Sequence, residues 1–219
     1  MDLLTVTSSA LAPESLAGLR KRVAEATEPD RAHGRNPYHY TFWYDLAASP
    51  RNVVEQVVRD ELRGHLPATE GAGPVGVEWW LGRLSAPYGT GFEFGVHRDF
   101  GEYRDTGVLA NPLYSSIIYL TTLEDGPLVV FRDLPSLQKP DYECAFPREN
   151  TFVVFPGDRW HAVLDREELL GAPASPPETG LRLTVVVNWW LHRLSTEVTE
   201  PMKLIAGEYD GTIHPELRA

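Results

Sequence analysis

Hydrophobic residues recur at helical spacing near the start of the chain. Leu16, Leu19 and Val23 lie three or four residues apart, which is typical of one face of a helix and predicts a helix over residues 13–26. A second set with the same spacing predicts a helix over residues 50–63. That set consists of Val53, Val54, Val57, Val58 and Leu62.

The segments that flank these helices carry signals of their own. Pro13 suits a first helical turn because proline has no amide hydrogen to leave unpaired there. Ser49 is expected to cap the second helix, with Pro50 at its first position. The aromatic segment at 38–44 is compatible with a strand, either as a packing layer at a sheet edge or as the wall of a substrate-binding mouth.

The pattern changes after residue 74 to short hydrophobic runs separated by turn-forming residues. Many short strands with such punctuation favour a sandwich or a jelly roll. The helices come first and no strand-helix alternation follows, which argues against a doubly wound parallel sheet. The predicted strands cover residues 75–84, 92–99, 115–123, 128–132, 150–155, 161–164 and 181–191.

The turn-forming run Glu-Gly-Ala-Gly-Pro at 70–74 marks this change of pattern. A chain of 219 residues has a normal length for a single all-β domain with helical additions, so we expect a single domain over residues 1–219. Within it we expect an N-terminal helical and aromatic support region at 1–73, a jelly-roll catalytic core at 74–191 and a C-terminal tail at 192–219.

The composition of the chain argues against two classes of partner, nucleic acids and membranes. The chain has 20 basic and 31 acidic residues, a formal net charge of −11, which is the wrong sign for holding a nucleic-acid backbone. No apolar run approaches the ~20 residues of a membrane span, and the N-terminus lacks the pattern of a signal peptide. Cys144 is the single cysteine, so no intrachain disulfide forms, as suits a cytoplasmic protein.

His97 and Asp99 have the spacing of two metal ligands. In a strand they share one face, while Val96 and Arg98 point to the other. His161 follows a Pro-Gly turn and begins another predicted strand. Two histidines and a carboxylate, with the remaining positions open, are typical of non-haem Fe(II) oxygenases. The alternative is a plain His–Asp hydrogen bond between structural side chains.

The same stretch also spells two protein-kinase motifs, His97-Arg98-Asp99 and Asp99-Phe100-Gly101. In a kinase these motifs lie in separate segments, and a glycine-rich loop and a strand lysine precede them. Here they overlap on one aspartate and neither preceding motif is found. The match is therefore interpreted as chance.

The order of these residues resembles the Fe(II)- and 2-oxoglutarate-dependent oxygenases, most closely their prolyl-4-hydroxylase-like branch. That family has His-x-Asp, a distal His some tens of residues later, and a basic residue on the penultimate core strand, often with Ser or Thr two places on. The matching residues here are His97, Asp99, His161, Arg182 and Thr184. The resemblance covers residues 84–190, roughly half the chain, and implies a mainly β fold with N-terminal helices and a double-stranded β-helix (jelly-roll) core.

Arg182 is the residue that the resemblance assigns to the cosubstrate. A guanidinium on an otherwise apolar strand is costly to bury unless it is paired, and a dicarboxylate supplies the pair through two hydrogen bonds. The Thr184 hydroxyl would add a third. Tyr119, in Ile-Ile-Tyr-Leu-Thr, matches the family's Tyr-Leu-Asn except that Thr121 replaces the Asn. The alternative is that Arg182 pairs with a structural Asp or Glu.

The resemblance implies a dioxygenase that uses Fe(II), 2-oxoglutarate and O₂ and hydroxylates an unactivated C–H bond, releasing succinate and CO₂. Asp99 argues against the related halogenases, which carry Ala or Gly at that place. The run at 124–127, Glu-Asp-Gly-Pro, departs from the Glu-Gly-Gly-Glu of the true prolyl hydroxylases. We therefore expect a small-molecule or amino-acid-like substrate, with a lid at residues 100–111.

Three alternatives to this function stay open on the sequence. The first is hydroxylation of a protein side chain by the same chemistry. The second is a cupin-type metal-dependent dioxygenase or isomerase that does not use 2-oxoglutarate. The third is a β-sandwich that binds a partner without catalysis.

Overall fold

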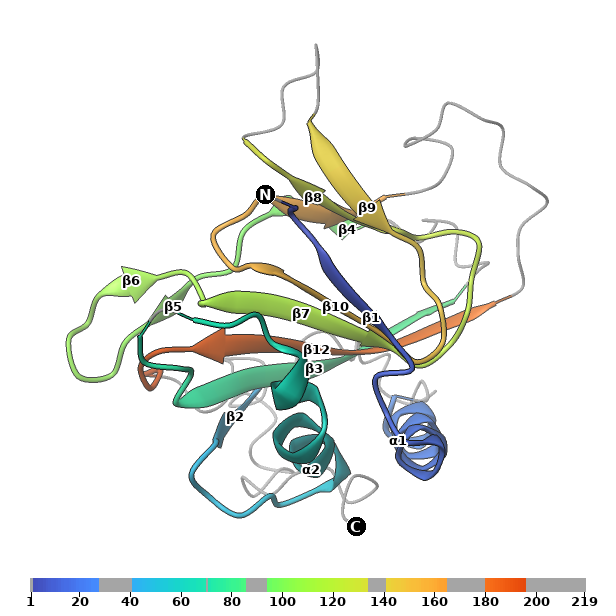
Figure 1. Ribbon diagram of the computed structural model, residues 1–219, viewed down its shortest axis with the longest axis horizontal. Coiled ribbons are helices and arrows are strands. Elements are labelled where there is room, and N and C mark those ends of the chain that lie inside the picture. The colour runs from blue at the N-terminus through green and yellow to red at the C-terminus, as the bar shows by residue number, and fades with distance from the viewer. Residues whose placement is uncertain are drawn as a thin grey trace, which may run out of the picture.

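Two antiparallel sheets face each other, and two helices cover the outer side of the larger one (Figure 1). The fold is mainly β, with N-terminal helices and a double-stranded β-helix core, as expected from the sequence. The computed structural model describes residues 2–27, 41–69, 71–85, 94–133, 141–164 and 180–195. Among the helices in these ranges, none is long and apolar enough to cross a membrane.

The larger sheet has six strands, in the spatial order β1 (Thr5–Ser8), β10 (Thr151–Pro156), β7 (Tyr114–Tyr119), β12 (Leu181–Trp190), β3 (Gly76–Ser85) and β2 (Phe42–Asp45). The smaller sheet has four, in the order β4 (Phe94–His97), β11 (His161–Val163), β8 (Leu128–Phe131) and β9 (Tyr142–Ala145). A short hairpin of β5 (Gly101–Glu102) and β6 (Leu109–Ala110) stands apart from both.

The chain passes back and forth between the two sheets, which is what makes the fold a jelly roll. It runs from β3 in the larger sheet to β4 in the smaller one, and then from β7 to β8 in the same way. After β9 it returns to the larger sheet in β10, crosses to β11 and ends in β12. Segments far apart in sequence are thereby brought together between the sheets.

β12 shows why the larger sheet separates two environments. Successive side chains of a strand point to opposite faces. Leu183, Val185 and Val187 point to the outer face and join the core that the helices cover. Arg182 and Thr184 point to the inner face, toward the smaller sheet, and are just as fully buried. The central strand therefore carries packing residues on one side and polar residues on the other.

The helices close the outer face of the larger sheet. α1 (Pro13–Ala26) has the bounds that the hydrophobic spacing predicts, and it buries Leu19 and Val23 in the core. α2 (Val53–Asp60) packs beside it and is followed by the single 3₁₀ turn η2 (Leu62–His65).

The start of the second helix is where the prediction was wrong. Ser49 does not cap α2. Asn52 does, because its side chain accepts a hydrogen bond from the backbone N–H of Glu55 at 3.0 Å. The helix was predicted over residues 50–63. In the structure it begins three residues later, at Val53, and is divided into α2 and η2.

The aromatic segment serves packing where the structure describes it. Phe42 stacks on Trp79 with ring centroids 4.4 Å apart, and Tyr44 is buried in the same core. Residues 38–40 of that segment lie outside the described ranges. Four strands, β1, β5, β6 and β9, were not predicted. β1 and β2 add edge strands to the larger sheet from within the predicted support region.

Candidate metal centre

Strand pairing places the two candidate histidines side by side. His97 ends β4 and His161 begins β11, and the two residues are direct partners across this antiparallel pair. Directly opposite residues of an antiparallel pair project from the same face, only a few ångströms apart. Their ring centroids are 4.3 Å apart, with the ring planes inclined by 55°.

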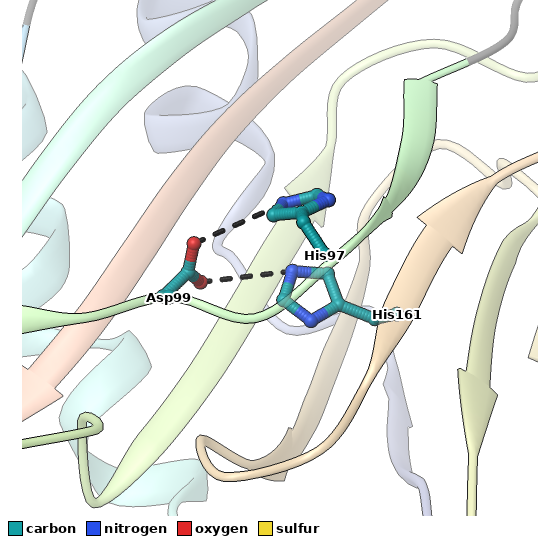
Figure 2. Close-up of side chains that lie close together, drawn as sticks. All are labelled: His97, Asp99 and His161. Carbon is teal, nitrogen blue, oxygen red and sulfur yellow. Dashed lines mark ion pairs between the residues drawn. The ribbon is translucent and has the colours of Figure 1, made fainter. Parts of the chain in front are cut away.

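Asp99 completes the cluster from just beyond β4. Its two carboxylate oxygens point to different histidines: Oδ1 lies 3.8 Å from Nε2 of His97, and Oδ2 lies 3.6 Å from Nε2 of His161 (Figure 2). The candidate ligand atoms of the three residues all lie within 4.8 Å of one another. The predicted strand over 92–99 was too long, because β4 ends at His97 and Asp99 lies in irregular backbone.

Two side chains from the next segment hold Asp99 in place. The hydroxyl of Ser115, on β7, donates to Oδ2 of Asp99 at 3.2 Å. The side-chain amide of Asn111 donates to the backbone carbonyl of Asp99 at 2.7 Å. The backbone at Asp99 is irregular, but these hydrogen bonds hold it in place. Because Asp99 lies beyond the end of β4, its carboxylate is positioned by Ser115 on β7.

His161 has the protonation state that a metal ligand needs. Its Nδ1 lies 3.0 Å from the carbonyl oxygen of Arg159, so Nδ1 donates and Nε2 presents its lone pair to the cluster. Burial lowers the pKa of His161 below its usual value, although the neighbouring Asp99 carboxylate acts in the opposite direction. The imidazole is neutral at pH 7, and the donor set of two nitrogens and one carboxylate fits Fe(II).

A cavity of about 300 Å³ opens next to the three residues. All three line it, as do Ile117, Val186 and Leu128 from the facing walls of the two sheets. This volume is at the lower end of the range of small-molecule sites. The cavity therefore has room for a compact ligand beside the candidate metal ligands.

Arg182 lines the same cavity and is 2% exposed. Within the described residues, its Nε and Nη2 atoms have no hydrogen-bond partner and no carboxylate forms an ion pair with it. The alternative of a structural Asp or Glu partner finds no support in this part of the chain. A buried guanidinium without a partner is costly and indicates a site for an anion.

Thr184 and Tyr119 lie beside Arg182 but do not line the cavity. The two residues are direct partners between β12 and β7. The Thr184 hydroxyl is fully buried and, among the described residues, has no hydrogen-bond partner. The Tyr119 ring lies under the guanidinium of Arg182, 5.4 Å from its Cζ, and the Tyr119 hydroxyl is 3.4 Å from the carbonyl of Ala145.

Arg98, between the two candidate ligands His97 and Asp99, packs on aromatic rings. Its guanidinium stacks on Trp160 at 4.5 Å and on Phe100 at 5.3 Å. The β5–β6 hairpin is tied to the end of the described chain by a bridge between Tyr103 and Leu194. A role as a lid for residues 100–111 stays a prediction.

Two polar residues of the cavity were missed on the sequence. Glu78 on β3 and Asn188 on β12 are direct partners, and both line the cavity. Burial raises the pKa of Glu78 to about 7; the Thr41 hydroxyl, which hydrogen-bonds to it, lowers the pKa, and the Asp99 charge raises it. The available signal was that Glu78 shares its face of the strand with the apolar Trp80 and Leu84.

Comparison with known proteins gives a fold but no close relative. Neither a protein-family model nor a curated protein matches the sequence. Among solved structures, a prolyl-4-hydroxylase from Pseudomonas putida is 16% identical, with 89% of this chain and 88% of that one covered and a TM-score of 0.53. The chain has the fold of the 2OG-Fe(II) oxygenases.

Two further structures support that assignment. A 2OG-Fe(II) oxygenase family oxidoreductase from Burkholderia pseudomallei is 13% identical, with 89% and 87% of the two chains covered and a TM-score of 0.51. HygX from Streptomyces hygroscopicus, solved with nickel and 2-oxoglutarate bound, is 15% identical, with 86% and 82% covered and a TM-score of 0.51. The resemblance found in the 2OG-Fe(II) oxygenase motifs thus extends to the fold of nearly the whole chain.

Proposed function

We propose that this protein is an Fe(II)- and 2-oxoglutarate-dependent dioxygenase that hydroxylates a C–H bond of a small-molecule or amino-acid-like substrate. The observation that carries the proposal is one cavity lined both by the His97, Asp99 and His161 cluster and by a buried Arg182 whose Nε and Nη2 have no partner among the described residues. The first set suits Fe(II) and the second suits the distal carboxylate of 2-oxoglutarate. A nickel- and 2-oxoglutarate-bound HygX structure of the same fold supports this pairing of ligands.

Each of these residues has a distinct task. His97, Asp99 and His161 would hold Fe(II) through two imidazole nitrogens and a carboxylate oxygen. When bound, Fe(II) supplies the activation of O₂, driven by the oxidative decarboxylation of 2-oxoglutarate to succinate and CO₂. Ser115 and the Arg159 carbonyl fix the orientation of Asp99 and His161.

Arg182 orients the cosubstrate from the opposite wall. Its planar guanidinium binds a carboxylate with two hydrogen bonds, and Tyr119 beneath it restricts its rotation. The Thr184 hydroxyl, which has no hydrogen-bond partner among the described residues, would add a further hydrogen bond to the same group. The apolar side chains of Ile117 and Val186 exclude water from the space between Arg182 and the metal ligands.

The experiment that tests the function is an anaerobic titration with Fe(II) and 2-oxoglutarate, followed by measurement of succinate after O₂ is added. We expect the charge-transfer band of an iron-bound 2-oxo acid in the wild-type protein. Arg182→Ala should bind Fe(II) normally but lose 2-oxoglutarate turnover. Arg22→Ala, which removes an arginine from the exposed side of α1, is the matched control.

The possible results separate the open alternatives. A wild-type protein that binds Fe(II) but shows no band with 2-oxoglutarate would favour a metal enzyme that does not use the oxo acid. A protein that binds no divalent iron would favour a non-catalytic β-sandwich. Retained turnover in Arg182→Ala would overturn the role of Arg182 alone.

A further inference from the structure

The cavity has opposite charges at its two ends. Arg182 and Asn188 project from the same face of β12, six residues apart, so their α-carbons are separated by roughly 20 Å. Glu78 lies directly beside Asn188 on the neighbouring strand. One end of the cavity is therefore marked by a guanidinium and the other by a carboxylate, and a single 2-oxoglutarate bound at Arg182 does not reach Glu78.

The acidic end lies close to the candidate metal ligands. Asn188 is the direct partner of Glu78 on one side and of Ser115 on the other. Ser115 is the residue whose hydroxyl binds Asp99. Neighbouring strands are about 4.8 Å apart, so the backbone of Glu78 lies about 10 Å from that of Ser115. A ligand group held by Glu78 would thus lie near the place where the reaction occurs.

Acceptors predominate at this end. Glu78 receives a hydrogen bond from the Thr41 hydroxyl, and the nearby charge that acts on its pKa is the negative charge of Asp99. Asn188 is 1% exposed, and its Oδ1 has no hydrogen-bond partner among the described residues. A buried amide oxygen without a donor is costly, and so is a buried carboxylate whose named donor is one neutral hydroxyl, unless a ligand supplies further donors.

The sum of charges in the site with Fe(II) and 2-oxoglutarate bound also favours a cationic ligand at Glu78. With the proposed cofactors bound, Fe(II) and Arg182 carry three positive charges, while Asp99 and 2-oxoglutarate carry three negative ones. These charges balance and leave Glu78 as an additional carboxylate in an enclosed cavity. A cation from outside the chain is the group that would neutralise it.

We propose that the substrate carries a primary ammonium group, which Glu78 and Asn188 bind at the end of the cavity opposite Arg182. An ammonium donates three hydrogen bonds, accepts none and carries the required charge, so it matches the carboxylate and the amide oxygen together. The inference rests on the proposed function, because it assigns a substrate class to the same site.

The electrostatics of Glu78 agree with this role. Burial raises the pKa of its carboxyl to about 7, which keeps it partly protonated while the cavity holds only water. An ammonium group next to Glu78 favours the ionised form of its carboxyl. Binding of the ammonium therefore creates a pair of opposite full charges. An N-acetylated or hydroxyl-bearing analogue lacks this gain and would be bound more weakly.

The first step of the test examines the cofactors alone. The wild-type protein, Glu78→Gln and Glu78→Asp are each titrated with Fe(II) and 2-oxoglutarate under anaerobic conditions. All three should show the same charge-transfer band and affinity, because Glu78 lies far from Arg182. Loss of the band in the wild-type protein would overturn the proposed function. A band in Glu78→Gln also shows that this variant is folded.

The second step adds a panel of L-amino acids and amino sugars, each paired with its N-acetylated form. We expect at least one amine to perturb the band and stimulate succinate release, with at least tenfold weaker binding of its acetylated partner. Glu78→Gln should weaken the binding of that amine at least tenfold, and Glu78→Asp should restore part of it. Glu14→Gln, an exposed carboxylate on α1 away from the cavity, is the control and should match the wild-type protein.

Three results of the second step would overturn the inference while leaving the proposed function standing. In the first, no amine of the panel binds more tightly than its acetylated partner. In the second, Glu78→Gln binds the amine as tightly as the wild-type protein. Equal weakening in Glu78→Asp and Glu78→Gln would show that shape, rather than charge, is what Glu78 supplies, and would also overturn it.

Discussion

Ser115 and Ser116 are neighbours on β7 whose hydroxyls serve opposite faces of the larger sheet. Ser115 donates to the Asp99 carboxylate in the cavity. Ser116 donates to the carbonyl of Val187 and accepts from the indole N–H of Trp189 on the other side. Substituting the two serines one at a time therefore separates the effect on metal binding from the effect on the stability of the fold.

We expect Ser115→Ala to lower the affinity for a divalent metal by about 10- to 100-fold, the usual effect of losing a hydrogen bond to a ligating carboxylate. Calorimetric titration with Mn(II) measures it. Ser116→Ala should leave that affinity unchanged and lower the free energy of unfolding by about 1–2 kcal/mol, because it unpairs buried groups. The reverse pattern would show that Asp99 is not a ligand.

Glu78 gives a pH-dependent prediction. Its pKa is about 7 in the folded protein and about 4.5 when unfolded, so between these values the folded state holds the proton more tightly. The free energy of unfolding of the wild-type protein therefore falls, relative to Glu78→Gln, as pH rises from 4.5 through 7. The shift from 4.5 to about 7 corresponds to a change of about 3 kcal/mol in the difference between the two proteins from pH 4 to pH 8.

Urea denaturation of the metal-free protein across this pH range measures the difference between the two proteins. Residues common to both cancel, so only the titration of position 78 contributes. A difference that is constant with pH would mean that the Glu78 carboxyl titrates at its ordinary pKa.

At the scale of single elements, the turn between β10 and β11 positions His161. A β-carbon added to Gly157 in this turn would lie 2.2 Å from the carbonyl oxygen of Pro112 and 2.7 Å from its Cγ. The first of these is a backbone atom that cannot move without shifting the chain. The turn can therefore approach the segment before β7 only if residue 157 is glycine.

Gly157→Ala is expected to destabilise the protein by about 1–3 kcal/mol through overpacking and to weaken metal binding by displacing His161. Gly64→Ala in η2 is the control, because a β-carbon there meets nothing within 4 Å. Thermal unfolding and Mn(II) titration of both variants test this. Unchanged metal affinity in a destabilised Gly157→Ala would show that β11 keeps its position without the turn.

The element scale also shows how far the sequence predicts the structure. Strands with buried residues on both faces, such as β10 and β12, stand out as hydrophobic runs and were found nearly to the residue. β1 was missed because it is a short edge strand whose Val6 is exposed, and β9 because Tyr142-Glu143-Cys144-Ala145 has no alternation. Their formation depends on a partner strand, which local sequence does not report.

The three candidate metal ligands could be predicted from the sequence, whereas Glu78 could not. The spacing of His97 and Asp99 and the position of His161 after a turn were visible in the sequence, and the structure brings the three residues together. Glu78 was missed because a carboxylate that alternates with apolar residues usually marks a solvent face. Only the packing of the smaller sheet over that face turns it into the wall of a cavity.

For the molecule as a whole, the buried charge of Arg182 couples ligand binding to stability. A ligand that binds only the folded state raises the free energy of unfolding by about 2.7 kcal/mol at a hundredfold excess over its Kd. For a chain of this length we expect Mn(II) and 2-oxoglutarate together to raise Tm by about 5–10 °C. 2-Oxoglutarate without metal should raise it much less.

Differential scanning calorimetry of the wild-type protein and Arg182→Ala measures this coupling. The variant should keep the increment from the metal and lose the increment from 2-oxoglutarate. A full 2-oxoglutarate increment in Arg182→Ala would place the cosubstrate elsewhere in the molecule.

The alternation along β12 has a consequence for how such a chain can change over evolution. Exchanging one inward side chain, such as Asn188, alters the cavity and leaves the contacts of Leu183 and Val185 with the helices intact. Inserting or deleting a single residue in β12 would reverse the two faces, moving a guanidinium into the helix-covered core and leucine into the cavity. Substitutions on the inward face of β12 can therefore change the substrate preference without disturbing the core. An insertion or deletion within the strand would disrupt both the core and the cavity.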